Sequence, residues 1–332
     1  MKRIFTADTH LSLYGNDRIK QGISERLYDI MAMLEKIVEY AYKNKISQII
    51  IGGDLCNDKD IIYTKPFVLF SEFLERHSTI NFIILSGNHD LDNTSDDQVS
   101  IVTSLKGVEN VECIINLTVK GNITYIPFSR NVVDDVLNAD PNDILISHFG
   151  LNEGSLNSGI SIVSDIGIKQ LKHFPLVLLG HYHKAQEIKS KDVEVYYVGS
   201  PIQKDWGEKH QEKRFLEFDD EKLSVKSIPL EGYTQYIELE ITDKDVAKEV
   251  IAQSKELKEE GHHVRVRNKT ENNIVEAGLQ VIQDSDDIDV TNRGVSLTMS
   301  FAEKCQKYMQ IKEIPEKSLK KYMEILNTTL NL

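Results

Sequence analysis

Long apolar runs, clustered cysteines and internal repeats are all missing from this sequence. No stretch approaches the ~20 consecutive apolar residues of a membrane-spanning helix, so we expect no membrane partner. Met1 leads straight into the strand-like RIFTAD, without an apolar signal segment. The three cysteines, Cys56, Cys113 and Cys305, are far apart, which indicates a reducing compartment and argues against a disulfide framework or a zinc knuckle. We therefore expect a cytoplasmic protein.

Positive charge is also scarce. The chain has 39 Lys and Arg against 52 Asp and Glu, a net charge of −13. This balance argues against a nucleic-acid partner, because DNA-binding proteins usually carry a basic surface. Bound divalent cations would, however, add local positive charge that formal counting misses. The acidic composition therefore weighs against a DNA partner without excluding one.

The first half of the chain alternates between strand and helix patterns. RIFTAD, SQIIIGGD and INFIILSGNHD are apolar runs typical of strands, and the apolar spacing predicts helices over 23–43 and about 66–76. This order predicts a layered α/β fold with a largely buried sheet. Further short runs extend the pattern: NITYIPF, DILISHFG, PLVLLGHYH and VEVYYVGSP.

After about Leu230 the character of the sequence changes. YTQYIELEI and HHVRVRN alternate like half-exposed strands, with a helical segment over 245–259 between them, which predicts a small α+β domain. The tail is predicted to form two helices broken at Pro315. The predicted domains are a catalytic domain over 1–230, a small capping and DNA-recognition domain over 231–300, and a helical tail over 301–332.

Side chains able to bind metals stand at the ends of five consecutive predicted strands. They are Asp8 and His10, Asp54, Asn88 with His89 and Asp90, His148, and His181 with His183. In α/β sheets, ligands gather at the carboxyl ends of strands. Hydrolytic divalent metals take carboxylate oxygen and neutral imidazole nitrogen, and two of them about 3.5–4 Å apart can clamp a phosphoryl group. The pattern predicts a distributed two-metal site.

The spacing inside these segments supports the same prediction. Residues two apart on an extended segment point to one side, so Asp8 and His10 would both face the metals, as would His181 and His183. Each segment taken singly is explained as well by a turn at a strand end. Their occurrence together, each after an apolar run, favours the site. The remaining histidines lack this context: His77, His173, His210, His262 and His263.

The series D-x-H, G-D, G-N-H-D, H and G-H-x-H, from Asp8 to His183, resembles the calcineurin-like metallophosphoesterase superfamily. The resemblance implies two sheets flanked by helices, a small α+β capping domain and C-terminal helices. It implies two divalent cations, Mn²⁺ first and Mg²⁺ as the alternative. By match to the motif, one metal takes Asp8, His10 and His183, the other takes Asn88, His148 and His181, and Asp54 bridges them.

The same resemblance implies the reaction. A metal-bridging hydroxide would attack phosphorus in line, while His89 contacts the phosphate and assists the leaving oxygen instead of binding metal. Asp90 would orient His89. The sequence departs from the family after G-D-L, where many members carry an aromatic residue and then His. Cys56 and Asn57 stand there in this chain, so the local fit of the substrate differs while no metal ligand is missing.

The stretch YYVGSPIQKDWGEKHQEKRFLEF resembles SbcD-type nuclease subunits of DNA repair and recombination, and the layout is most like phage recombination endonuclease subunits. This implies an exonuclease and endonuclease that works on DNA with an SbcC-type coiled-coil ATPase, as a homodimer within a heterotetramer. The location implied is the cytoplasm of a bacterium or a phage-infected host cell. Two alternatives stay open: a stand-alone phosphodiesterase or phosphatase for small phosphoesters, and a non-catalytic scaffold that binds DNA ends.

Overall fold

The computed structural model describes residues 1–92, 99–129, 131–155, 164–271 and 274–283. They belong to two compact units, and each unit is described by itself. The first comprises residues 1–237 and 261–263, and the second comprises residues 238–260 and those from 264 onward. The predicted tail over 301–332 lies outside the described residues. Within the described ranges, no helix combines the length and the apolar character needed to cross a membrane.

The first unit contains two six-stranded sheets. In one, parallel strands β1, β4, β5 and β6 are extended at one edge by antiparallel β13 and β14. Their bounds, in sheet order, are β14 Ser224–Leu230, β13 Lys213–Asp219, β1 Lys2–Thr6, β4 Gln48–Ile51, β5 Asn81–Leu85 and β6 Val111–Ile114. The other sheet runs β11 Gln186–Lys189, β12 Glu194–Tyr197, β10 Val177–Gly180, β9 Ile144–His148, β8 Ile123–Ile126 and β7 Thr118–Lys120.

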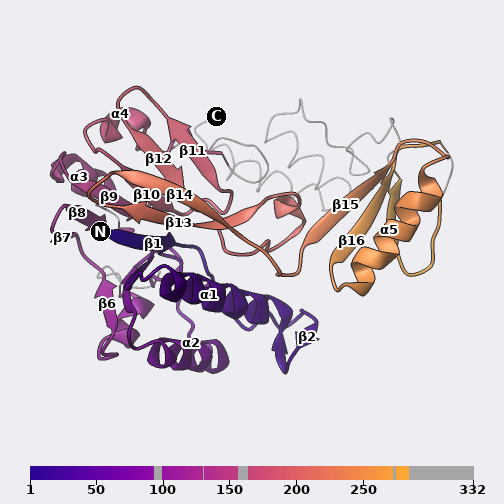
Figure 1. The fold of residues 1–332 in the computed structure, drawn as a ribbon, viewed down its shortest axis with the longest axis horizontal. Helices are drawn as coiled ribbons and strands as arrows, with labels where there is room; N and C mark the ends of the chain where they lie inside the picture. The colour runs from indigo at the N-terminus through magenta and orange to yellow at the C-terminus, as the bar shows by residue number, and fades with distance from the viewer. Residues whose placement is uncertain (93–98, 130, 156–163, 272–273, 284–332) are drawn as a thin grey trace, which may run out of the picture. The chain divides into compact units, whose positions relative to one another are not determined.

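Helices cover the outer face of each sheet. α1 (Glu25–Lys43) and α2 (Thr64–Arg76) lie on the sheet of β1, and α3 (Val132–Asn138) and α4 (Ile168–Leu171) lie on the other (Figure 1). The minor elements are a ribbon of β2 (Ile19–Lys20) and β3 (Ile23–Ser24), and 3₁₀ turns at Ile101–Leu105 and Trp206–Glu208. The predicted α/β sandwich of two sheets flanked by helices is therefore confirmed.

Burial on both faces explains why the strands have uninterrupted apolar sequences. On β5, Phe82 and Ile84 pack toward the helices, while Ile83 and Leu85 pack between the two sheets. A strand buried on both faces shows no polar alternation. Polar residues become frequent where these strands end, which is where the candidate site residues stand.

The second unit is small and mixed. β15 (Tyr236–Ile241), which begins in the first unit, forms a three-stranded sheet with β16 (His263–Asn268) and β17 (Gln280–Gln283), and α5 (Ala247–Glu259) connects β15 to β16. β15, α5 and β16 lie where the sequence pattern predicted them. In this unit Glu238 is buried and accepts hydrogen bonds from Arg265 and Arg267.

Candidate metal centre

The segments that follow β1, β4 and β10 are hydrogen-bonded to one another. The Asp8 N–H donates to the Gly53 carbonyl over 3.0 Å, and the His10 N–H donates to the Asp54 carbonyl over 2.9 Å. The His181 N–H donates to the Asp8 carboxylate, with N–O distances of 3.0 and 3.1 Å. These bonds place residues far apart in the chain around one point.

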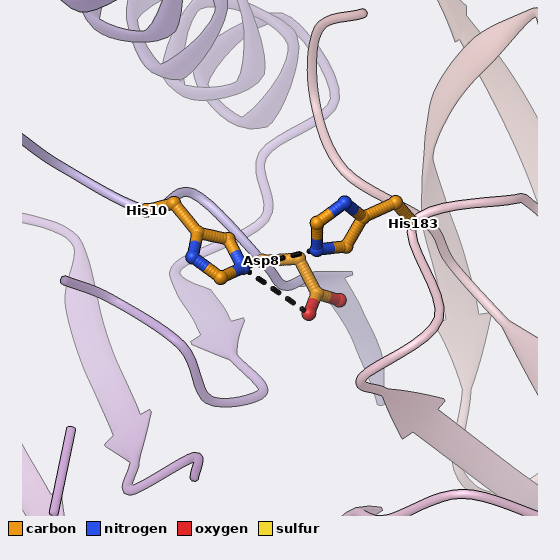
Figure 2. Close-up of side chains that lie close together, drawn as sticks. All are labelled: Asp8, His10 and His183. Atoms are coloured by element: carbon orange, nitrogen blue, oxygen red, sulfur yellow. Dashed lines mark hydrogen bonds and ion pairs between the residues drawn. The ribbon is translucent and has the colours of Figure 1, made fainter. Parts of the chain in front are cut away.

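The first cluster consists of Asp8, His10 and His183, whose donor atoms all lie within 4.8 Å of one another (Figure 2). Nε2 of His10 lies 3.1 Å from Nε2 of His183 and 3.9 Å from Oδ1 of Asp8. Asp8 and His10 are buried. Two imidazole nitrogens this close must share a proton or a cation, because their lone pairs otherwise repel.

The second cluster consists of Asn88, His148 and His181. Oδ1 of Asn88 lies 3.2 Å from Nε2 of His148 and 2.9 Å from Nδ1 of His181. Nδ1 of His148 donates to the Gly52 carbonyl over 2.8 Å, so Nε2 is the nitrogen left for a ligand. A backbone carbonyl that fixes a histidine tautomer in this way is typical of metal sites.

Asp54 lies between the two clusters. One carboxylate oxygen is 3.4 Å from Nε2 of His10, and the other is 3.3 Å from Nε2 of His148. The second oxygen also accepts the His89 N–H over 2.8 Å. A carboxylate with one oxygen toward each cluster has the arrangement that a bridging ligand requires.

Burial dominates the electrostatics of these groups. It raises the pKa of Asp8, lowers that of His10, and lowers the pKa of His181 to about 3. Asp54 and His148 are exceptions: against the effect of burial, their attraction holds the pKa of Asp54 well below its usual range and raises that of His148 to about 9. The negative charge of Asp54 favours a proton or a cation beside it, so cation binding there would be coupled to proton release.

The donor set fits divalent cations. Buried carboxylates, one amide oxygen and neutral imidazoles are the ligands that hydrolytic metals take. Donor atoms of Asp8, Asp54 and His148 lie within 4.8 Å of one another, across the two predicted ligand sets. The division of roles stays a prediction, because donor atoms of His10, Asp54 and His89 also lie within 4.8 Å of one another.

The backbone at four site residues is left-handed. The φ angles are 56° at Asp8, 50° at His10, 51° at Asp54 and 99° at His181. Such values are uncommon outside glycine and are typical of strained functional sites. They correct the expectation that an extended backbone aims Asp8 with His10, and His181 with His183. The side chains reach the site from tight turns instead.

Two glycines make room for these turns. Gly53 has a φ of +98°, and a Cβ there would lie 2.3 Å from Nδ1 of His148. A Cβ on Gly87 would lie 2.2 Å from the Asp54 nitrogen. Any side chain at either position would therefore displace a candidate ligand.

His89 borders the first cluster, half-buried. Its ring meets that of His10 edge to face, with centroids 4.8 Å apart. Nδ1 donates to the Asn57 carbonyl over 2.7 Å, which leaves Nε2 free to exchange a proton. Asn57 is one of the two positions at which the sequence departs from the family pattern. Because its backbone carbonyl orients the His89 ring, this role does not depend on the side chain at position 57.

Asp90 does not orient His89, contrary to our expectation. Its buried carboxylate holds the loop after β4 against the end of β5, by accepting hydrogen bonds from the N–H groups of Leu55, Cys56 and Gly87 at 3.2, 2.9 and 2.8 Å. Burial, reinforced by the nearby Asp54, raises the pKa of Asp90 to about 7. Asp90 therefore supports the site by holding the backbone of these two segments, and not by a hydrogen bond to His89.

Sequence reasoning missed a charged network behind His183. Oε1 of Glu208 accepts a hydrogen bond from Nδ1 of His183 over 3.0 Å, and Oε2 accepts one from Nζ of Lys213 over 2.5 Å. Burial opposes the charge of Glu208, yet His183 and Lys213 lower its pKa to about 2. Lys204 is also buried nearby, and burial lowers its pKa to about 8. Charged residues are ordinarily exposed, so nothing in the sequence marked these three as buried.

Comparison with known proteins gives one family and two curated relatives. The calcineurin-like phosphoesterase family matches residues 1–185, more than half of the chain. The chain is 23% identical over 250 residues to putative phosphoesterase 078R of Invertebrate iridescent virus 3, covering 67% of this chain and only 65% of the viral protein. It is 25% identical over 294 residues to the D subunit of nuclease SbcCD of Staphylococcus saprophyticus, covering 75% of this chain and 74% of that protein.

Solved structures that align with this chain include an archaeal phosphodiesterase and a nuclease. The phosphodiesterase aligns with a TM-score of 0.39 and 15% identity, over 69% of this chain and 100% of that one. Nuclease MPE of Pseudomonas putida aligns with a TM-score of 0.34 and 13% identity, over 64% of this chain and 83% of that one.

Proposed function

Because the chain belongs to the calcineurin-like phosphoesterase family, and is therefore a metal-dependent hydrolase of ester bonds, we propose that it is a two-metal DNA nuclease. In this proposal it processes DNA ends in recombination and repair, as exonuclease and endonuclease, together with an SbcC-type ATPase. It would work in the cytoplasm of a bacterium or a phage-infected host cell.

One observation favours DNA over a small molecule as the substrate. The similarity to the SbcCD nuclease protein covers 75% of this chain, whereas the phosphoesterase family matches residues 1–185 of the 332. It therefore includes chain beyond the phosphoesterase domain. We propose that residues 231–300 form a capping part that recognises DNA.

The candidate ligands are proposed to bind two cations. One cation would be held by Asp8, His10 and His183, and the other by Asn88, His148 and His181. Asp54 would bind both cations. Bound divalent cations, Mn²⁺ in our proposal, would supply charge neutralisation on the phosphoryl oxygens and an activated water. The carbonyl of Gly52 and the carboxylate of Glu208 keep His148 and His183 turned toward the site.

We propose that His89 donates a proton to the leaving oxygen. Because Nδ1 is held by the Asn57 carbonyl, the proton that a doubly protonated ring can give away is the one on Nε2. Passing it to the departing ribose oxygen avoids the release of an alkoxide. General acid catalysis of this kind is worth roughly two to four orders of magnitude in rate.

The proposed partners follow from the same similarity. We propose that the tail over 301–332 docks on the coiled coil of the ATPase, and that the protein forms a homodimer within a heterotetramer. The support is the similarity to a protein whose name makes it one subunit of the nuclease SbcCD.

A second candidate is a stand-alone phosphodiesterase for small phosphoesters, and one surface feature favours it. A cavity of about 230 Å³ beside His89 is lined by Asp58, Asp60 and Asp92 together with apolar side chains. Carboxylates in the lining of this cavity repel a second phosphate, and the net charge of −13 acts in the same direction. A substrate with a single phosphodiester avoids this cost.

One experiment separates the two candidates. Purified full-length protein with Mn²⁺ is given linear duplex, single-stranded and hairpin DNA, and in parallel bis(p-nitrophenyl) phosphate and cyclic nucleotides. The nuclease proposal predicts DNA cleavage that is lost in Asp54→Ala. Hydrolysis of the small esters alone, with all three DNA substrates intact also when the ATPase is present, would contradict it.

A further inference from the structure

Lys204 is a buried cation at the edge of the candidate metal centre. The residue is only 8% exposed. The hydrogen-bonding group that we find for its Nζ, among the described residues, is Nε2 of His183 at 3.5 Å. That nitrogen belongs to the first cluster. The long side chain therefore ends in the site and not in solvent.

Lys213 provides the contrast. It is buried to a similar degree, but its Nζ lies 2.5 Å from a carboxylate oxygen of Glu208, 2.9 Å from the Ser200 hydroxyl and 3.1 Å from the His183 carbonyl. Its charge is therefore compensated inside the protein. Nζ of Lys204 has no carboxylate oxygen within 4.0 Å in the described part of the chain, although its backbone N–H donates to Glu208 over 3.3 Å.

A buried charge without a hydrogen-bonded counter-ion is unfavourable, and Glu208, Asp8 and Asp54 attract this one only from a greater distance. Cations bound by Asp8, His10 and His183 would make this surrounding more positive still. A bound anion would supply a counter-charge in direct contact with Nζ. The anion that a phosphoesterase site receives is the phosphoryl group of its substrate.

We propose that the ammonium group of Lys204 binds a non-bridging phosphoryl oxygen of the substrate and is a substrate-binding residue of this site. The proposal rests on the metal centre proposed above and not on DNA being the substrate. A charge-assisted hydrogen bond to phosphate at a buried position contributes about ten- to a hundred-fold in affinity.

The test compares Lys204→Met, which keeps the straight side chain but removes the charge, with Lys226→Met, which removes one charge from an exposed position of β14. Lys204→Gln is a second neutral variant. For each Mn²⁺-loaded protein, the Mn²⁺ content, the thermal unfolding and the calorimetric Kd for inorganic phosphate are measured, together with KM for bis(p-nitrophenyl) phosphate.

We expect Lys204→Met and Lys204→Gln to retain two Mn²⁺ and the fold, while Kd for phosphate and KM both rise about ten- to a hundred-fold. Lys226→Met should match the wild type. Unchanged phosphate affinity in folded variants would overturn the proposal, as would a change in Mn²⁺ content that alone accounts for the loss. If the wild type took up no Mn²⁺, the metal centre would be wrong, yet phosphate binding that depends on Lys204 would still support the role of Lys204.

Discussion

Nδ1 of His183 donates a hydrogen bond over 3.0 Å to Oε1 of Glu208, a residue 25 positions later in the chain. The bond turns Nε2 of His183 toward His10 and Asp8. A carboxylate that orients a ligand histidine in this way is typically worth 10- to 100-fold in metal affinity or activity. Glu208 is therefore expected to affect metal binding at the first cluster without being a metal ligand itself.

Replacing Glu208 by Ala should weaken Mn²⁺ binding by about 10- to 100-fold, because the His183 ring loses its acceptor. Glu208→Gln is the matched control, since its amide oxygen can still accept the bond, and it should lose less. Equilibrium dialysis against Mn²⁺ measures both. Equal Mn²⁺ affinity in Glu208→Ala and the wild type would rule out this orienting role.

Asp54→Ala should abolish hydrolysis of every substrate. One histidine of each cluster, His10 or His148, lies within 3.4 Å of an Asp54 carboxylate oxygen, so removal of Asp54 deprives both predicted cations of a ligand. Turnover of bis(p-nitrophenyl) phosphate and Mn²⁺ content are the measurements. A variant that binds two Mn²⁺ and turns over normally would show that Asp54 is no bridge.

His89→Gln should keep both cations and lose roughly two to four orders of magnitude in rate, the usual value of a general acid. The relevant comparison is metal content by elemental analysis with single-turnover rates on the same preparation. Loss of one cation from the variant would instead identify His89 as a ligand, which the short distances among His10, Asp54 and His89 would permit.

Gly53→Ala should destabilise the fold by about 2–5 kcal/mol, because the new Cβ meets the His148 ring and the residue has a φ of +98°. Gly22→Ala isolates the backbone effect, since Gly22 has a φ of +84° but open space around its Cα. It should cost only about 1–2 kcal/mol. Urea unfolding gives both values, and similar costs for the two variants would contradict the predicted clash.

Deleting residues 301–332 should leave folding and Mn²⁺-dependent hydrolysis intact and eliminate co-purification with the coiled-coil ATPase. The two helices predicted from the sequence of this tail would be marginal in water unless they packed on a surface, which we propose is the ATPase. Co-expression and affinity purification of the truncated and full chains tests this. Unfolding of the truncated protein, or undiminished co-purification, would refute the docking.

The sandwich and its helices could be predicted because burial leaves a simple pattern: α1 carries its apolar residues at helical spacing, and β5 is apolar on both faces. The positions of the candidate ligands could be predicted because polar residues return where each strand ends. The left-handed turns at Asp8 and His10 were missed because spacing alone does not distinguish a turn from an extended segment. Glu208 and Lys204 were missed because their burial depends on residues far away in the chain.

The candidate ligands come from both halves of the sandwich. Asp8, Asp54 and Asn88 follow strands of one sheet, whereas His148 ends a strand of the other and His181 follows the next. Cations held among them would therefore act as a cross-link at the seam between the sheets, much as a disulfide joins distant segments, and would favour the folded over the unfolded chain. Withdrawing the metal would then loosen the architecture as well as stop the chemistry.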